Sequence, residues 1–236
     1  MLFRSRLIEA IQQNSFLQAL PNNPLNLLLL CVVFEDYEGE LPSRRTELYQ
    51  IIVRCILRRF CAKNKLEAPQ DDEALEKKFE QSLLALGELA WKCLLEDRLS
   101  FRERVLAKFE AMYKDLAARI SGLVFKEASL KKINPQHEYH FFHKTFQEHL
   151  AARYLAFLLL KKEFNIFKEF HLDFHNHIVV KYRQVFLFLS GILGEKASIL
   201  FRQIGEKLKS DNWDWLKCKR EEGTLDRKST RLNSSH

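Results

Sequence analysis

The stretch Glu138–Leu155, with the sequence EYHFFHKTFQEHLAARYL, changes its hydrophobic period partway along. At its start, aromatic side chains crowd the short run Tyr139 to Phe142, which is typical of a β-strand. From Lys144 onward the apolar residues recur with the spacing of an α-helix. The stretch therefore predicts a strand that ends near Phe142 and a helix that begins beside His143.

A second run of β-branched and aromatic residues, Leu123 to Phe125, precedes this stretch. Between the two runs lies Asn134-Pro135, a dipeptide that is typical of turns. The two runs therefore predict a small β-hairpin in an otherwise helical protein. Helices before a hairpin, followed by another helix, fit a winged-helix type of unit.

The N-terminal part of the chain predicts a series of helices. Asn23 suits an N-cap and Pro24 the first position of a helix that continues to Tyr37. Because this helix is apolar nearly all round, we expect it to be buried on every side. Pro42-Ser43 is expected to start the next helix, whose basic residues Arg54, Arg58 and Arg59 could contact phosphates.

The remaining helices follow a polar connector, residues 64–73. Apolar residues recur at helical spacing from Phe79 to Leu94, and Ser100 is expected to cap a shorter helix that runs through Met112. Near the C-terminus, the apolar helix Val185 to Leu193 contains Ser190-Gly191, which indicates close helix packing.

The composition is that of a globular protein. The chain has 236 residues, of which 47% are hydrophobic and 29% charged, and this balance excludes wholesale disorder. Its longest uninterrupted apolar run, Leu27 to Phe34, is far shorter than the roughly 20 residues that a membrane-spanning helix needs. The five cysteines include no C-x-x-C pair, which favours reduced thiols in a cytoplasmic protein.

The formal net charge of +7 includes a contribution from the last residues. Residues 226–236, DRKSTRLNSSH, match one reading frame of common sequencing-adapter DNA. We therefore expect this tail to be foreign to the natural protein and exclude it from the functional argument. Without it the chain is only mildly basic, and charge alone does not favour binding to nucleic acid.

No catalytic motif is present in the sequence. Four histidines lie within residues 137–149, but their spacing is not H-E-x-x-H and no cysteines or acidic residues complete a zinc site. Neither G-x-S-x-G nor the phosphate-binding G-x-x-x-x-G-K-[ST] occurs. We therefore expect that the chain is not an enzyme and holds no metal.

Three segments resemble the C-terminal part of the NACHT module of animal NOD-like receptors (NLR proteins). NNPLNLLLLC (22–31) and LPSRRTELY (41–49) are similar to the "NPL-x-L-x-x-LC" and "LP-x-x-R-x-x-LY" patterns of its first helical subdomain. Residues 141–155 resemble the "F-x-H-x-x-FQE-x-x-AA-x-Y" end of its winged helix, although His149 stands where many relatives have an aromatic residue. FLFLSGIL (186–193) is similar to a helix of the second helical subdomain.

The resemblance implies a nucleotide-gated switch. In this family an upstream ATPase subdomain holds the P-loop and the acidic residues that bind magnesium, and neither is present in this chain. Pro24 matches the proline that packs on the adenine, and His143 matches the histidine that hydrogen-bonds the phosphate of ADP in the closed, resting state. The implied cofactor is therefore ADP or ATP, and the intact protein would be a slow ATPase-type switch.

We thus expect a mainly α fold: a first helical subdomain (1–66), a winged-helix subdomain (67–162) and part of a second helical subdomain (163–225), followed by the foreign tail. The expected function is to couple nucleotide state to oligomerisation in innate-immune-type signalling. The expected partners are the upstream nucleotide-binding subdomain of the same chain, with a P-loop encoded before Met1, and further copies of the protein. A freestanding helical adaptor without nucleotide and a winged-helix nucleic-acid binder are the alternatives.

Overall fold

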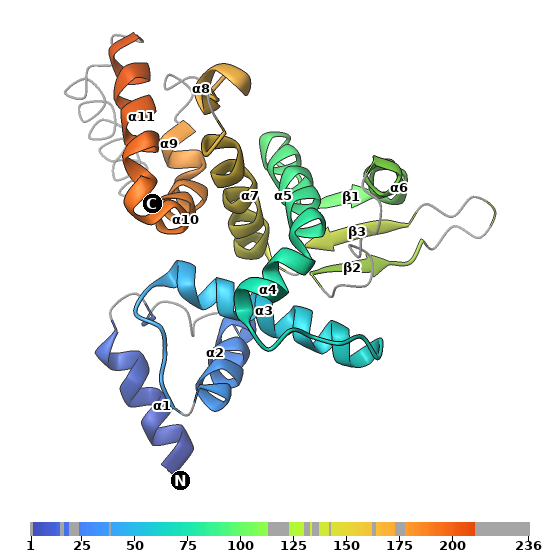
Figure 1. Ribbon diagram of the computed structural model, residues 1–236, viewed down its shortest axis with the longest axis vertical. Coiled ribbons are helices and arrows are strands. Elements are labelled where there is room, and N and C mark those ends of the chain that lie inside the picture. Colours follow the sequence, from blue (N-terminus) through green and yellow to red (C-terminus); the bar gives the residue numbers. More distant parts are fainter. Residues whose placement is uncertain are drawn as a thin grey trace, which may run out of the picture.

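A computed structural model of the chain confirms a mainly helical fold with a small antiparallel sheet (Figure 1). It describes residues 2–14, 17–18, 24–37, 39–112, 123–129, 133, 137–141, 143–161, 164–172 and 178–210. The helices are α1 (Leu2–Gln13), α2 (Pro24–Asp36), α3 (Arg45–Lys63), α4 (Asp72–Lys78), α5 (Glu80–Leu95), α6 (Glu103–Met112), α7 (Lys144–Leu159), α8 (Ile166–Glu169), α9 (Ile178–Lys181), α10 (Arg183–Leu193) and α11 (Ser198–Ser210), with the 3₁₀ turn η3 (Gly194–Ala197) between the last two. The strands are β1 (Ser100–Arg102), β2 (Val124–Glu127) and β3 (Glu138–Phe141).

The predicted hairpin is confirmed by β2 and β3, which pair antiparallel with Val124 opposite Phe141. The turn at Asn134-Pro135, the N-cap at Asn23 and the tail 226–236 lie outside the described residues.

The sheet also contains β1, which pairs with β3 and gives the strand order β1-β3-β2. The prediction that Ser100 caps a helix is therefore wrong. Ser100 begins β1, and its hydroxyl lies 3.2 Å from Glu138 Oε2 on β3. The neighbouring Phe101 is buried between the rings of Tyr139 and Phe141, so burial of this ring draws the segment into the sheet.

Helix α7 is the centre of the molecule and packs against α5 on one side and α10 on the other (Figure 1). Gly87 of α5 permits the first contact, because a Cβ atom there would lie 2.5 Å from the carbonyl oxygen of Leu150. The fully buried Gln147 of α7 also bonds across this contact, since its Nε2 donates to the carbonyl oxygens of Ala90 at 3.3 Å and Arg98 at 2.9 Å. These contacts hold α7 against α5 and against the turn that follows α5.

Helix α10 also contacts α3, which supports the interpretation of Ser190-Gly191 as a close-packing site. A Cβ atom on Gly191 would lie 2.2 Å from Thr46 Oγ1 of α3, and Arg45 Nη1 donates to Gln184 Oε1 at 2.9 Å. The helical span Arg183–Ser210 is long and apolar enough to cross a membrane by length and composition alone. In this fold, however, Phe188 and Leu189 of that span are buried in the protein core.

The prediction that α2 is buried on every side is wrong. Leu30 and Val33 are buried, but the side chains of Leu27 and Leu28 are 39% and 60% exposed. Within the described residues, α2 is covered along one face by neighbours such as α1, where the Phe3 and Phe34 rings meet edge to face at 5.4 Å. An apolar side of α2 near Pro24 is therefore left uncovered.

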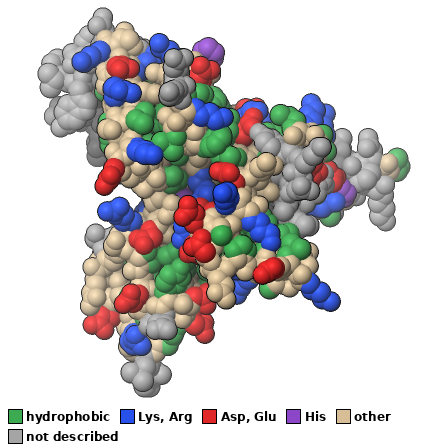
Figure 2. All heavy atoms as spheres, viewed as in Figure 1, with side chains coloured by type: hydrophobic (Ala, Val, Ile, Leu, Met, Phe, Trp, Pro, Cys, Tyr) green, Lys and Arg blue, Asp and Glu red, His purple; other side chains and the backbone are tan. Residues whose placement is uncertain are grey.

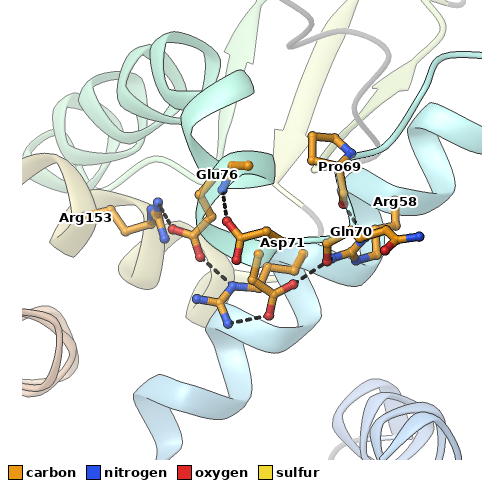
Figure 3. A network of polar contacts seen from close by, with 9 residues as sticks. Arg58, Pro69, Gln70, Asp71, Glu76 and Arg153 are labelled. Atoms are coloured by element: carbon orange, nitrogen blue, oxygen red, sulfur yellow. Dashed lines mark hydrogen bonds and ion pairs between the residues drawn. The ribbon is translucent and has the colours of Figure 1, made fainter.

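An ion-pair network joins α3, α4 and α7 (Figure 3). Arg54 lies 3.0 Å from Asp72 and 2.5 Å from Glu76, and Arg153 of α7 lies 2.8 Å from the other oxygen of Glu76. Arg58 binds Asp72 and the carbonyl oxygens of residues 69 and 70. The expectation that Arg54 and Arg58 contact phosphates is therefore not favoured, because both guanidinium groups are occupied within the protein.

We expect Glu76→Gln to lower the free energy of unfolding by about 1 kcal/mol, because two arginines lose their shared partner in a partly buried site. Burial alone would raise the pKa of Glu76, but Arg153 and Arg54 outweigh it and hold that pKa below its usual value. The stabilisation is therefore present above pH 4.5 and lost as the pH falls further. Urea unfolding measures the loss, with the exposed Glu73→Gln of the same helix as the control. An equal loss of unfolding free energy in Glu76→Gln and Glu73→Gln would contradict a stabilising role of the Glu76 ion pairs.

Candidate functional site

His143 stands at the N-cap of α7 with extended backbone angles, φ −160° and ψ 155°. Its Nδ1 accepts a hydrogen bond from the backbone N–H of Thr145 at 3.2 Å. Because a backbone N–H can only donate, Nδ1 carries no proton, and the proton of the neutral imidazole lies on Nε2. The N-terminus of a helix also favours negative charge, through its backbone N–H groups and its dipole. His143 therefore carries its ring proton on Nε2 at the N-terminal end of α7, where the backbone N–H groups of Thr145, Phe146 and Gln147 already bond to His143 itself.

A chain of hydrogen bonds leads from His143 into the protein. His143 Nδ1 lies 2.9 Å from Thr145 Oγ1, and the hydroxyl of Tyr49 on α3 lies 2.6 Å from the same Oγ1. The Tyr49 hydroxyl also lies 3.5 Å from Oδ1 of Asn26 on α2. We call these four residues, Asn26, Tyr49, Thr145 and His143, the relay. It joins three helices from distant parts of the sequence.

Pro24, the other predicted nucleotide contact, occupies the first position of α2, as the sequence predicts. Its side chain is exposed. Because Asn26 of the same helix turn belongs to the relay, the structure brings the starts of α2 and α7 to the same region through Tyr49. That either residue contacts nucleotide stays a prediction.

Tyr49 is held within an aromatic cluster behind the relay. Its ring centroid lies 5.0 Å from those of Phe146 and Phe188 and 5.8 Å from that of His149. Burial raises the pKa of Tyr49, and the hydrogen bond to Thr145 opposes that effect only in part. The Tyr49 hydroxyl therefore keeps its proton at neutral pH and can donate it to Thr145.

Sequence reasoning did not identify Asn26, Tyr49 or Thr145 as part of the site. Tyr49 closes the "LP-x-x-R-x-x-LY" pattern and Asn26 lies within "NPL-x-L", so both stood in the quoted motifs without an assigned role. A threonine two residues after a predicted N-cap is a local signal for a contact with the capping side chain. No local signal pairs Tyr49 with Thr145, because 96 positions separate them.

His149 lies at the junction of α7 with α3 and α10, and it is fully buried. Within the described part of the chain, neither ring nitrogen has a hydrogen-bond partner. Burial, together with the charge of Arg153, lowers the pKa of His149 well below 6.5. The groups that face it across the junction, Tyr49 and Phe188, are uncharged, so the ring is buried in its neutral form.

We expect acid to destabilise the fold through His149. The unfolded ring binds a proton near pH 6.5 and the folded ring resists it, so stability falls as the pH drops below 6.5. The expected slope is about 1.4 kcal/mol per pH unit for this one group, which is the free energy of one unit of pKa. His149→Phe should remove that slope between pH 6.5 and the range in which carboxylates titrate. Urea unfolding at several pH values tests this, and identical slopes in the wild type and the variant would contradict it.

A small pocket of about 200 Å³ lies beside the first two turns of α7. Its charged lining consists of Lys144 and Glu148 from α7, Asp97 and Arg98 from the turn after α5, and Lys181 from α9. Burial raises the pKa of Glu148, and the nearby Lys144 and Arg45 oppose that effect. Lys181 and Asp97 pair at 2.8 Å, so part of this charge is already compensated.

The other histidines have structural surroundings where they are described. His137 Nδ1 accepts from the backbone N–H of Ser129 at 3.1 Å, and His140 stacks on Phe125 and lies 2.7 Å from Glu127. Among the residues that the structure describes, no group of three or more His, Cys, Asp or Glu side chains is arranged to hold a metal ion.

Comparison with known proteins identifies a distant relative. No family model matches the chain. The chain is 26% identical over 211 residues to the NLR family CARD domain-containing protein 4 of Xenopus tropicalis, a match that covers 87% of this chain and 20% of that protein. The chain thus spans about a fifth of the length of this curated relative. The similarity is consistent with an NLR-type family, as the sequence motifs indicate.

Proposed function

We propose that this chain is a regulatory part of a nucleotide-gated receptor of the NACHT type, in which it couples the nucleotide state to oligomerisation. The observation that carries the proposal is the geometry of His143. Its Nδ1 accepts a hydrogen bond from the Thr145 N–H at 3.2 Å, which puts the proton of the neutral ring on Nε2, and the residue is the N-cap of a 16-residue helix. A histidine donor at such a helix end is suited to a phosphate oxygen.

In the proposed closed state, His143 Nε2 donates to a phosphate of ADP and the ring of Pro24 packs against the adenine. Pro24 can offer this flat apolar surface without losing a helical hydrogen bond, because it stands at the first position of α2. The uncovered apolar residues Leu27 and Leu28 on the same helix provide a surface for the nucleotide-binding subdomain. That subdomain would supply the P-loop and the magnesium ligands, and oligomerisation would follow when it separates from this part.

A charge-assisted hydrogen bond to phosphate contributes roughly 1.5–3 kcal/mol. A contact of this size, made only in the closed state, is enough to bias an equilibrium between two arrangements of subdomains. The proposed chemistry of this chain is therefore nucleotide-dependent positioning and not hydrolysis.

Surface charge gives less support to nucleic-acid binding. On the face drawn in Figure 2, lysine and arginine side chains are scattered and interleaved with aspartate and glutamate. A nucleic-acid site would be expected to gather its basic side chains in one patch or stripe.

We expect the chain of 236 residues alone to bind ADP or ATP weakly or not at all and to hydrolyse neither, because it contains no P-loop. Isothermal titration calorimetry with ADP and a phosphate-release assay with ATP measure both properties. The matched sample is a receptor-length protein, by which we mean one with the P-loop subdomain of the same gene ahead of Met1, and it should bind ADP. Micromolar ADP affinity of the chain alone, or none in the receptor-length protein, would contradict the proposal.

A further inference from the structure

We propose that Tyr49 and Thr145 are positioning residues whose hydroxyl groups reinforce the protonation pattern that the backbone N–H of Thr145 sets on His143, and make its strength depend on the position of α3. The consequence for nucleotide binding rests on the proposed function, whereas the effect on the His143 ring depends only on the contacts within the relay. The backbone N–H of Thr145 donates to Nδ1 of His143, and this bond requires that Nδ1 be unprotonated.

The direction of every other hydrogen bond in the relay follows from that requirement. Because Nδ1 has no proton, its 2.9 Å contact with Thr145 Oγ1 requires the threonine hydroxyl to donate. A hydroxyl has one proton, so Thr145 Oγ1 must accept at its 2.6 Å contact with Tyr49, and Tyr49 donates. Because the single Tyr49 proton goes to Thr145, the 3.5 Å contact of the Tyr49 hydroxyl with Asn26 Oδ1 is the longer and weaker of its two contacts.

Through the relay, the position of α3 therefore affects which ring nitrogen of His143, at the start of α7, carries the proton. Tyr49 belongs to α3 and is 1% exposed, and its ring is fixed by Phe146 of α7 and Phe188 of α10. If α3 moves away from α7, Thr145 loses the donor that orients its hydroxyl, and Nδ1 loses a well-directed hydrogen bond. His143 then has a weaker preference for a proton on Nε2, the atom proposed to donate to phosphate.

Nδ1 has one lone pair, which the Thr145 hydroxyl at 2.9 Å and the Thr145 backbone N–H at 3.2 Å share. The backbone bond alone would be shared by any residue at this position. The hydroxyl adds a second donor whose direction is set from outside the helix, by Tyr49. A merely structural role of Thr145 would be satisfied by valine, which has the same shape.

The test is the tautomer of His143 in the ¹⁵N-labelled chain, read from long-range ¹H–¹⁵N correlation spectra and assigned by its loss in His143→Ala. We expect the wild type to show a pyridine-type Nδ1 and a pyrrole-type Nε2. Thr145→Val and Tyr49→Phe, which preserve shape and ring packing, should both shift the two nitrogens towards averaged values. Thr145→Ser should restore the wild-type pattern, and Thr46→Val, the same change on α3 outside the relay, should leave it intact.

If both Thr145→Val and Tyr49→Phe keep the wild-type ¹⁵N pattern of His143, the inference is overturned, whatever the result of the ADP-binding measurement. A second measurement separates this outcome from failure of the proposed function. In the receptor-length protein, Thr145→Val should weaken ADP binding about two- to ten-fold, as expected for one hydrogen bond, and should have no further effect when His143 is already alanine. If the spectra change as expected but ADP affinity does not, the positioning role stands and the phosphate contact of His143 is wrong.

Discussion

Replacement of His143 by leucine in the receptor-length protein is expected to cause oligomerisation without a stimulus. The variant loses a contact with ADP that is proposed to exist only in the closed state. A loss of roughly 1.5–3 kcal/mol shifts the ratio of closed to open protein by about ten- to a hundred-fold. The helical core should stay folded, because the side chain of His143 is half-buried and bonds to Thr145 at the end of the helix.

Light scattering of the variant with ADP present measures the oligomeric state. His137→Leu is the matched control, because it removes a histidine whose Nδ1 also accepts from a backbone N–H, at Ser129, but which lies outside the relay. Pro24→Ala should lower nucleotide affinity modestly, because the ring loses packing area against the adenine, but it should not cause oligomerisation without a stimulus. A His143→Leu protein that stays monomeric and binds ADP as tightly as the wild type would leave His143 with a structural role only.

Substitution of Gly87 by alanine is expected to destabilise the fold by about 1–3 kcal/mol, although alanine favours a helix over glycine. The new Cβ atom would lie 2.5 Å from the carbonyl oxygen of Leu150 and 2.8 Å from Tyr154 Cβ. Neither backbone nor Cβ can move aside without separating α5 from α7, and this contact supports the start of α7.

Gly205 of α11 provides the control, because a Cβ atom there has nothing within 4 Å among the described residues. Gly205→Ala is therefore expected to stabilise the protein by roughly 0.5–1 kcal/mol through helix propensity. Urea unfolding should give opposite signs for the two glycine variants. Stabilisation by both would show that α5 and α7 are not packed as closely as described.

Local sequence patterns predicted the longer helices and the hairpin, because each depends on residues near one another in the chain, whereas the short helices α4, α8 and α9 were not predicted. The change of period in 138–155 marked both β3 and α7, and Pro24 marked the start of α2. The strand β1 was missed because its three residues, Ser100–Arg102, are too few to show alternation. The exposure of Leu27 and Leu28 was missed because a uniformly apolar helix carries no signal of which face its neighbours cover.

The site was predicted only in part, for a related reason. His143 and Pro24 came from family patterns, and their places at the starts of α7 and α2 agree with the local signals. The hydrogen bond between Tyr49 and Thr145 depends on the tertiary packing of α3 against α7, which no periodicity encodes. Gly191 similarly indicated close packing, but only the fold identifies Thr46 as its neighbour.

The claim that His143 contacts a phosphate is tested most directly by comparing ADP with adenosine, which lacks phosphate. Calorimetric titration of the receptor-length protein and its His143→Ala variant gives the affinity of each ligand. The account predicts that His143→Ala weakens ADP binding by about ten- to a hundred-fold and leaves adenosine binding unchanged. An equal loss for both ligands, or no loss for ADP, would contradict it.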